Sequence, residues 1–269
     1  MDGMKMGEEQ WGAAPEKDLK LFAGETELKI GRLSKLTGVK AGTIRFYEKC
    51  GFLEPAKRLP NGYRIFGGRH IYQIRVCRLV FGGFVNKRLR RISRDILQAS
   101  RDWKPEAYRQ AADGYLQAVE EDIGRTKIAV DFVMDRLQEI REEREEPLTY
   151  TKKEAARLVG VTAETIRNWE RSGLFRQRAR YEKRRYSRQE LRRMYVIRLL
   201  LDIGYSMMAV RSFFREYDAG DRAQALRGLV KPEENQDLIY RADRYMETLV
   251  HTKEKARQLC AMADEMKEV

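Results

Sequence analysis

The sequence predicts a mainly α protein that contains two winged helix-turn-helix domains, each followed by a long coiled-coil helix. Three observations support this fold class. A stretch of 16 residues recurs in similar form, each copy precedes a segment with coiled-coil periodicity, and 35% of the residues are charged, which is typical of long solvated helices. The chain has 269 residues, which is enough for two domains of ordinary size.

The repeated stretch reads GVKAGTIRFYEKCGFL from Gly38 and GVTAETIRNWERSGLF from Gly160, at an offset of 122 residues (160 − 38). Gly, Val, Thr, Ile, Arg, Glu and Gly match in one ungapped register. A basic segment that ends in an aromatic residue follows each copy, and then come two helical runs separated by Gly83-Phe84 or Gly204-Tyr205. Two copies of one module therefore account for about residues 28 to 268.

Each module begins with the pattern of a helix-turn-helix. The runs IGRLSKLTGV and TKKEAARLVGV can form a first helix that packs inward through residues such as Leu33, Leu36 and Val39. Gly38 and Gly160 then supply the turn. The next helix of such a motif enters the major groove of DNA. The excess of 54 Lys and Arg over 41 Asp and Glu, a net charge of +13, also favours a polyanionic partner, with nucleic acid ahead of a membrane surface.

The second helix of each module carries the candidate contacts to DNA. Arginine can bind guanine or phosphate, and threonine can bind phosphate or touch a thymine methyl group. Ile44 and Phe46 are expected to face inward or an interface. The aromatic candidates have an open alternative, because large aromatic side chains mostly pack in cores. The predicted contacts on these helices are Lys40, Thr43, Arg45, Tyr47, Thr162, Thr165, Arg167 and Trp169.

A basic hairpin behind each helix is predicted to lie along the DNA backbone as a wing. Pro60-Asn61-Gly62 is a strong turn signal in the first copy, whereas the second copy lacks Asn-Gly and its hairpin is less well defined. The predicted wing residues are Arg58, Tyr63, Arg64, Arg180, Arg184, Arg185 and Tyr186.

Two segments have apolar residues in alternating steps of four and three, over about four heptads each. The first seam is Leu116, Val119, Ile123, Thr126, Val130, Val133, Leu137 and Ile140, and the second is Ala242, Tyr245, Leu249, Thr252, Ala256, Leu259, Ala263 and Met266. The predicted domains are a flexible tail (1–27), a first head (28–103), a first connecting and coiled-coil helix (104–146), a second head (147–217), and a second connecting segment with its coiled-coil helix (218–269).

The order of these features resembles the MerR family of bacterial transcription regulators. The first copy, TIRFYE, fits the family signature T-[IVL]-R-[YF]-Y-E throughout, whereas TIRNWE is similar to a tryptophan-bearing branch and departs at Asn168 and Trp169. The resemblance implies a protein that binds double-stranded DNA, pairs through antiparallel terminal helices, distorts promoter DNA and acts with RNA polymerase.

Because both halves lie in one chain, we expect an intramolecular pseudo-dimer, with a homodimer that has four heads as the alternative. The two recognition helices differ, so we expect an asymmetric operator with two unlike half-sites. Other hypotheses are an architectural or excisionase-like protein that bends DNA, and a small-molecule-binding or scaffold protein with degenerate heads.

No cofactor, metal site or enzymatic activity is expected, because phosphate-loop and nucleophile motifs are absent and the two histidines lie in unrelated settings. Cys50, Cys77 and Cys260 are far apart in sequence. Without a signal peptide or a long apolar run, the expected location is the cytoplasm, with no membrane partner. The aromatic residues between head and coil are expected to pack against the coil, with an effector pocket as the alternative; they are Trp103, Tyr108, Tyr115, Phe214 and Tyr217.

Overall fold

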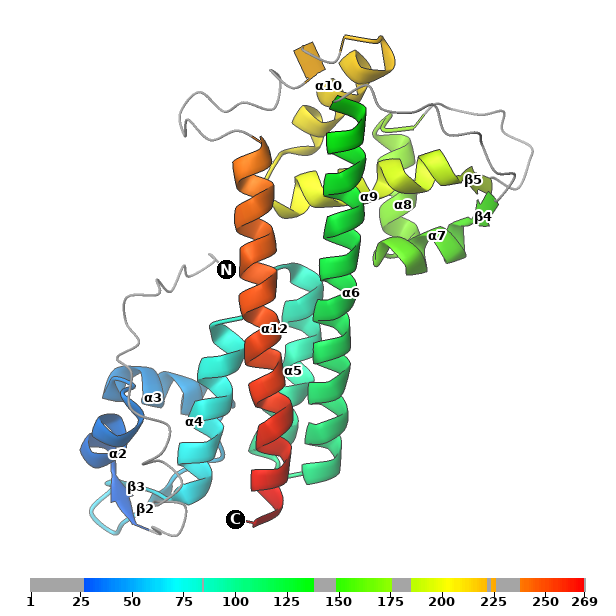
Figure 1. Cartoon of the computed structure of the whole chain (residues 1–269). Helices are drawn as coiled ribbons and strands as arrows, with labels where there is room; N and C mark the ends of the chain where they lie inside the picture. Colours follow the sequence, from blue (N-terminus) through cyan, green and yellow to red (C-terminus); the bar gives the residue numbers. More distant parts are fainter. Residues whose placement is uncertain are drawn as a thin grey trace. The chain divides into compact units, whose positions relative to one another are not determined.

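The computed structural model describes residues 27–83, 85–137, 149–175, 185–221, 224–225 and 238–268. These residues are mainly helical with a few short strands, which confirms the predicted α class (Figure 1). The chain divides into two compact units. Unit 1 comprises the residues up to 119 together with those from 250 onward, and unit 2 comprises residues 120–249. Most of the predicted tail and the segment 138–148 lie outside the described residues.

Unit 1 starts with the first helix-turn-helix. Its helix-turn-helix and sheet elements are β1 (Leu28–Lys29), α2 (Ile30–Thr37), α3 (Ala41–Lys49), β2 (Lys57–Arg58) and β3 (Arg64–Phe66). Gly38 ends α2 with a φ of 67°, a left-handed conformation that glycine adopts without strain. Leu33 of α2 and Ile44 of α3, on either side of this turn, are both fully buried.

The predicted first hairpin is present. The three strands pair in the antiparallel order β1-β3-β2, with Arg58 opposite Arg64. At the turn, Gly62 donates its N–H to the carbonyl of Leu59 and has a φ of 82°. The Asn-Gly pair is therefore used as the sequence predicts, because a side chain at Gly62 would be strained in this conformation.

Unit 1 continues as a helical bundle of α4 (Gly68–Phe81), α5 (Lys87–Arg101) and parts of two long helices, α6 (Pro105–Leu137) and α12 (Leu238–Glu268) (Figure 1). Tyr72 of α4 donates its hydroxyl to the Met262 carbonyl at 2.8 Å, and Tyr108 of α6 donates to the Leu259 carbonyl at 3.1 Å. These buried hydroxyl groups each have a backbone partner, so the bundle closes without leaving them unsatisfied.

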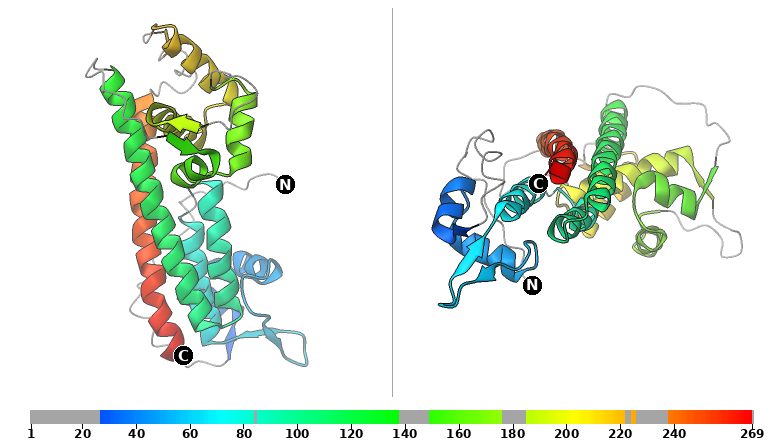
Figure 2. Two further views of the ribbon diagram at one scale, coloured as in Figure 1. Left: turned by 90° about the vertical axis from the view of Figure 1, so that its right-hand side faces the viewer. Right: turned by 90° about the horizontal axis from the view of Figure 1, so that it is seen from below.

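Unit 2 repeats the design of the first head. Its elements besides the remaining parts of α6 and α12 are β4 (Thr149–Thr151), α7 (Lys152–Val159), α8 (Ala163–Arg171), β5 (Arg185–Ser187), α9 (Arg188–Asp202) and α10 (Met207–Asp218) (Figure 2). Gly160 ends α7 with a φ of 76°. Thr151 and Glu154 form a capping box that starts α7, and Ser187 and Glu190 form another that starts α9.

A buried ion network fixes the turn of the second helix-turn-helix. Asp122 of α6 is 1% exposed and lies 2.9 Å from Arg198 Nη2 and 3.0 Å from Arg125 Nη1. Arg198 donates to the Val159 carbonyl at 2.6 Å, and Arg125 donates to the Leu158 carbonyl at 2.7 Å. The carboxylate therefore holds two guanidinium groups against the end of α7, where helix carbonyls have no partner within the helix.

Replacement of Asp122 by Ala should destabilise unit 2 by about 3 kcal/mol, because Arg198 would keep its buried charge and lose its main counterion. Asp131→Ala removes an exposed carboxylate from the same helix and should change the stability by less than about 0.5 kcal/mol. Urea unfolding followed by circular dichroism measures both. Equal stabilities for the two variants would contradict this role of Asp122.

His70 at the start of α4 is buried and held in its neutral form. Its Nδ1 accepts the Gly67 N–H at 3.0 Å, so the hydrogen must be on Nε2, which lies 3.2 Å from the Glu54 carbonyl oxygen. Burial lowers the pKa of His70, and the nearby Glu54 carboxylate opposes this only in part. In the unfolded chain the same imidazole takes up a proton near pH 6.5.

The folded pKa of His70 is below the unfolded value, so the unfolded state binds more protons as the pH falls through about 6.5. The contribution to stability is complete above that pH and is lost below it. His70→Gln keeps a donor and an acceptor but does not titrate. Between about pH 7.5 and about pH 5.5, we expect the wild-type melting temperature to fall by a few degrees more than that of His70→Gln. Parallel pH dependence of the two proteins would rule out this effect.

Candidate nucleic-acid interface

The two predicted recognition helices, α3 and α8, bury the same positions and expose the same positions. Ile44 and Tyr47 are buried in α3, and Ile166 and Trp169 are buried in α8. A spacing of three residues places each pair on one face of a helix. The opposite face is therefore the outward face in both heads. Its members are Gly42, Thr43, Arg45, Phe46 and Lys49 in α3, and Glu164, Thr165, Arg167, Asn168 and Arg171 in α8.

Three aromatic residues predicted to face DNA are instead core residues, and that prediction was wrong. Tyr47 is 1% exposed and its ring centroid lies 5.2 Å from that of Phe81. Trp169 is 2% exposed, and Tyr186 is fully buried and donates its hydroxyl to Glu170 at 2.7 Å. The physical reason is the helical spacing, which puts Tyr47 and Trp169 on the same face as the buried isoleucines.

Phe46 was expected to face inward or an interface, and its 44% exposure on the outward face excludes the inward position. Exposure of a large aromatic ring on a recognition helix leaves it available to touch a thymine methyl group. Asn168 is the exposed residue at the equivalent position of α8.

A glutamate, which the sequence analysis did not single out, joins each recognition helix to the strands. Glu48 accepts from Arg64 Nε at 2.7 Å and from the Ala56 N–H at 3.2 Å. Glu170 is bonded to Lys152 Nζ and to the Tyr186 hydroxyl, each at 2.7 Å. The glutamate recurs at the same offset of 122 residues in the two copies, and this repetition could have indicated a shared structural role. Each glutamate thus links its recognition helix to a described strand of the same head, β3 in the first and β5 in the second.

The basic wing residues have different surroundings. Arg58 and Tyr63 are exposed at the first hairpin, with Tyr63 at 69%. Arg64 is half-buried and forms an ion pair with Glu48. Arg185 is exposed and donates to the Thr149 hydroxyl and carbonyl oxygens at 2.6 and 2.9 Å. The predicted contacts Arg180 and Arg184 lie outside the described residues.

The first turns of the two recognition helices also differ. Lys40 is exposed and precedes α3 without a side-chain cap. Thr162 caps α8 by accepting the Thr165 N–H at 3.0 Å, and the two hydroxyl groups lie 2.8 Å apart. Thr43 and Thr165 are half-buried. The second head therefore uses for helix capping a residue that the prediction assigned to DNA contact.

Positive charge is concentrated in the two heads. Residues 28–103 contain 18 Lys and Arg against 4 Asp and Glu, a net charge of +14, and residues 147–217 contain 17 against 7, a net charge of +10. The remainder of the chain carries −11, because the whole chain carries +13. A polyanion would therefore be attracted to the heads rather than to the long helices.

The aromatic residues between head and coil and the cysteines lie in the following surroundings. Tyr108, Tyr115 and Phe214 are buried in the core, in agreement with the packing role that the sequence favoured. Burial raises the pKa of the Cys77 thiol, and burial likewise raises the pKa of Cys260 to about 11, so both thiols are protonated at neutral pH. In the part of the chain that the structure describes, no group of three or more His, Cys, Asp or Glu could hold a metal ion.

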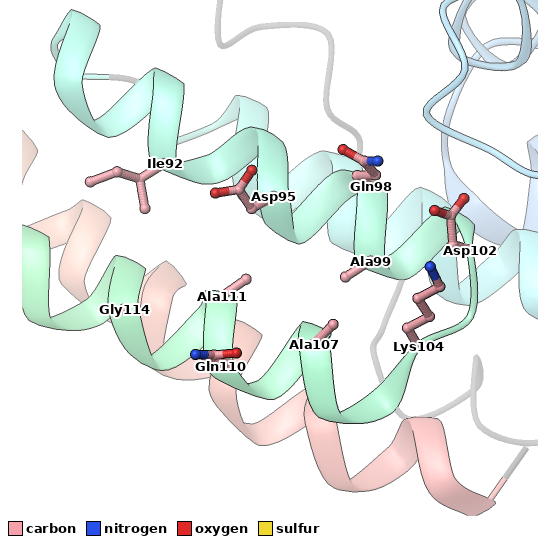
Figure 3. Close-up of a pocket in the computed structure, with 10 residues that line it drawn as sticks. All are labelled: Ile92, Asp95, Gln98, Ala99, Asp102, Lys104, Ala107, Gln110, Ala111 and Gly114. Atoms are coloured by element: carbon pink, nitrogen blue, oxygen red, sulfur yellow. The ribbon is translucent and has the colours of Figure 1, made fainter.

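A groove of about 490 Å³ lies between α5 and α6 in unit 1 (Figure 3). Ala99, Ala107 and Ala111 line its floor, and Asp102 and Lys104 lie at one end. The polar side chains along it are exposed, so they do not form the buried, convergent set that orients a ligand. None of the aromatic residues proposed for an effector pocket lines this groove.

Comparisons with known proteins identify both heads. Residues 29–66 match the MerR family regulatory protein model, and residues 150–217 match the MerR HTH family regulatory protein model. The chain carries two tandem helix-turn-helix modules of the MerR family. The match to the second module includes α7, α8 and β5, whose arrangement repeats that of the first head.

Curated MerR relatives align with only part of the chain. The HTH-type transcriptional regulator HmrR of Sinorhizobium medicae is 34% identical over 90 residues, which are 32% of this chain and 61% of the relative. The HTH-type transcriptional regulator CueR of Escherichia coli O157:H7 is 35% identical over 51 residues, which are 19% of this chain and 38% of the relative. No solved structure matches significantly. Among the described helices, none combines the length and apolar character needed to cross a membrane.

Replacement of Tyr47 by Phe tests the corrected placement of this residue. The hydroxyl of Tyr47 is buried and has no hydrogen-bond partner among the described residues. Its removal should raise the free energy of unfolding by about 1 kcal/mol, because a desolvated and unbonded polar group is lost. The affinity for DNA should stay the same within about twofold. Urea unfolding and fluorescence anisotropy measure the two quantities, and a large loss of affinity with unchanged stability would restore Tyr47 as a contact residue.

Proposed function

We propose that this protein is a sequence-specific transcription regulator that binds double-stranded DNA with both heads at an operator of two unlike half-sites. The observation that carries the proposal is the repeated outward face of α3 and α8, which presents Thr43 and Arg45 or Thr165 and Arg167 at equivalent positions. The names of the relatives, which are transcriptional regulators, support the same class of function.

The proposed contacts follow from the outward faces and the wings. Arg45 and Arg167 are exposed and can reach base edges or phosphates, with Thr43 and Thr165 beside them. Lys40, Arg58, Tyr63 and Arg185 are exposed around these helices and would hold the backbone. Arg64 would act through Glu48, by fixing the hairpin against the recognition helix.

The two long helices are proposed to pair antiparallel, so that one chain acts as a pseudo-dimer. Contacts within unit 1 support this: Tyr108 of α6 bonds Leu259 of α12, and Tyr115 and Thr252 both bond the Gly83 carbonyl. A later residue of α6 therefore lies beside an earlier residue of α12, as expected for helices that run in opposite directions. Seam positions such as Ala256 and Leu259 are fully buried. Distortion of promoter DNA and contact with RNA polymerase rest on the family resemblance.

The first experiment is selection of bound duplexes from a randomised DNA pool with the full chain, followed by sequencing. Two unlike half-sites about one helical turn apart are expected, because the exposed residues of α3 and α8 differ. A palindrome would mean that two chains pair through one kind of head. Binding without any enriched motif would favour the architectural alternative, and absence of binding would favour the scaffold alternative.

Replacement of Arg45 by Ala should weaken binding to the selected operator by about tenfold or more and relax the preference at one half-site only. The reason is that Arg45 is the exposed arginine of the first recognition helix. Lys127→Ala, which removes one positive charge from the exposed side of α6, is the matched control. If both variants bound with wild-type affinity and motif, Arg45 would have no role in recognition.

A further inference from the structure

The outward face of α8 is occupied by a closed cluster of charged side chains centred on Glu164. The Glu164 carboxylate accepts from Arg167 Nη1 at 2.8 Å and also from Arg171 Nη2. Arg171 Nη2 additionally donates to Asn168 Oδ1 at 2.6 Å. The hydrogen bond from Arg167 is the main reason that the pKa of Glu164 is lowered, so the carboxylate is ionised at neutral pH. Two arginines of the predicted DNA-binding face are thus paired with a carboxylate on the same face.

The first head has no such carboxylate. Gly42 occupies the position of Glu164, and both residues lie in the first turn of their helix. Arg45 and Lys49 stand where α8 has Arg167 and Arg171. Among the described residues, Arg45 has no hydrogen-bond or ion-pair partner. The outward face of α3 therefore presents uncompensated positive charge, whereas that of α8 is partly neutralised.

A second difference between the heads also makes the first head the more positively charged of the two. The helix that follows the glycine turn in unit 1, α5, exposes Lys87, Arg91 and Arg94. The corresponding helix of unit 2, α10, begins with Met207 and Met208, and Met208 is 70% exposed. Its two exposed arginines, Arg211 and Arg215, are offset by Glu216 and Asp218 of the same helix. The excess of positive charge in the first head is therefore present on more than one element that faces solvent.

We infer that Glu164 is a specificity-determining residue, which holds Arg167 and Arg171 and makes the second head a weak but discriminating reader of DNA, while the first head anchors the protein. This inference rests on the proposed function. A phosphate that approaches α8 must displace the carboxylate from the arginines and is repelled by it. A base edge that offers a donor, such as the cytosine amino group, can instead bond Glu164 directly. The carboxylate thus lowers sequence-independent affinity more than specific affinity.

The alternative role for Glu164 is structural, because an acidic residue in the first turn of a helix stabilises the helix dipole. The two roles predict different effects on DNA binding when Glu164 is replaced. A structural residue, when replaced, lowers stability and leaves the preference for DNA sequence unchanged. The proposed role requires tighter binding to unrelated DNA when the carboxylate is removed, even if the melting temperature falls slightly.

The test uses the full chain with two reciprocal variants, Glu164→Gln and Gly42→Glu. A side chain at Gly42 would meet no atom within 4 Å of its Cβ, so Gly42→Glu introduces the carboxylate without a clash. It also replaces a glycine by a better helix former, so it should stabilise α3. Glu247→Gln, which removes an exposed carboxylate from α12, controls for the change in net charge.

Affinity is measured by fluorescence anisotropy on a mixed-sequence duplex of about three helical turns, over a range of salt concentrations. Glu164→Gln should bind this duplex about threefold to tenfold more tightly, with the slope of log affinity against log salt steeper by about one. Gly42→Glu should bind it more weakly by a similar factor despite its higher melting temperature. Selection from a randomised pool with Glu164→Gln should also give a broadened motif at one half-site.

Each outcome decides one of the two claims. If the wild-type chain binds DNA and Glu164→Gln changes neither the salt slope nor the selected motif relative to Glu247→Gln, the role of Glu164 is wrong and the proposed function stands. If the wild-type chain binds neither the mixed-sequence duplex nor any member of the pool, the proposed function itself fails.

Discussion

The geometry of both heads depends on the burial of two side chains three residues apart on each recognition helix. Ile44 and Tyr47 in α3, like Ile166 in α8, are at most 1% exposed, and this fixes which face of each helix points away from the core. A rotation of either helix about its axis would expose a large apolar side chain, which is unfavourable by roughly 1.5 to 3 kcal/mol for each residue exposed. Both inward positions hold large apolar or aromatic side chains in the two heads, although Tyr47 of α3 is replaced by Trp169 in α8.

The positions of strands β3 and β5 depend on the same constraint through Glu48 and Glu170. Each glutamate lies next to the buried aromatic residue of its helix and accepts two hydrogen bonds from groups outside that helix. Because a half-buried carboxylate keeps its partners close, the strands are held at a defined position beside the recognition helix. In the second head the strand residue that bonds the glutamate is a buried tyrosine rather than an arginine. The same link between helix and strand is therefore an ion pair in the first head and a hydrogen bond from a hydroxyl group in the second.

The sequence predicted the helix-turn-helix order, the glycine turns and the first hairpin, because these follow from local patterns with a physical cause. It did not predict the side on which Tyr47, Trp169 and Phe46 lie. Their placement depends on the register of the helix against the core, which a short segment with apolar residues on several sides leaves ambiguous. The pairing of Glu164 with Arg167 and Arg171 could have been predicted from spacings of three and seven residues, which place all three on one helix face.

The differences between the two copies are distributed unevenly between the core and the surface. Positions that set the fold are shared: Gly38 and Gly160 make the turns, Ile44 and Ile166 fill the cores, and Glu48 and Glu170 hold the strands. Differences such as Gly42 against Glu164 and Phe46 against Asn168 lie on the outward faces. Cores tolerate few changes in volume, whereas solvated helix faces tolerate many. In a protein made of two identical chains, any change on this face would alter both half-sites together. Because the two heads lie in one chain, a change on one outward face leaves the other unchanged, which is what the proposed operator of two unlike half-sites requires.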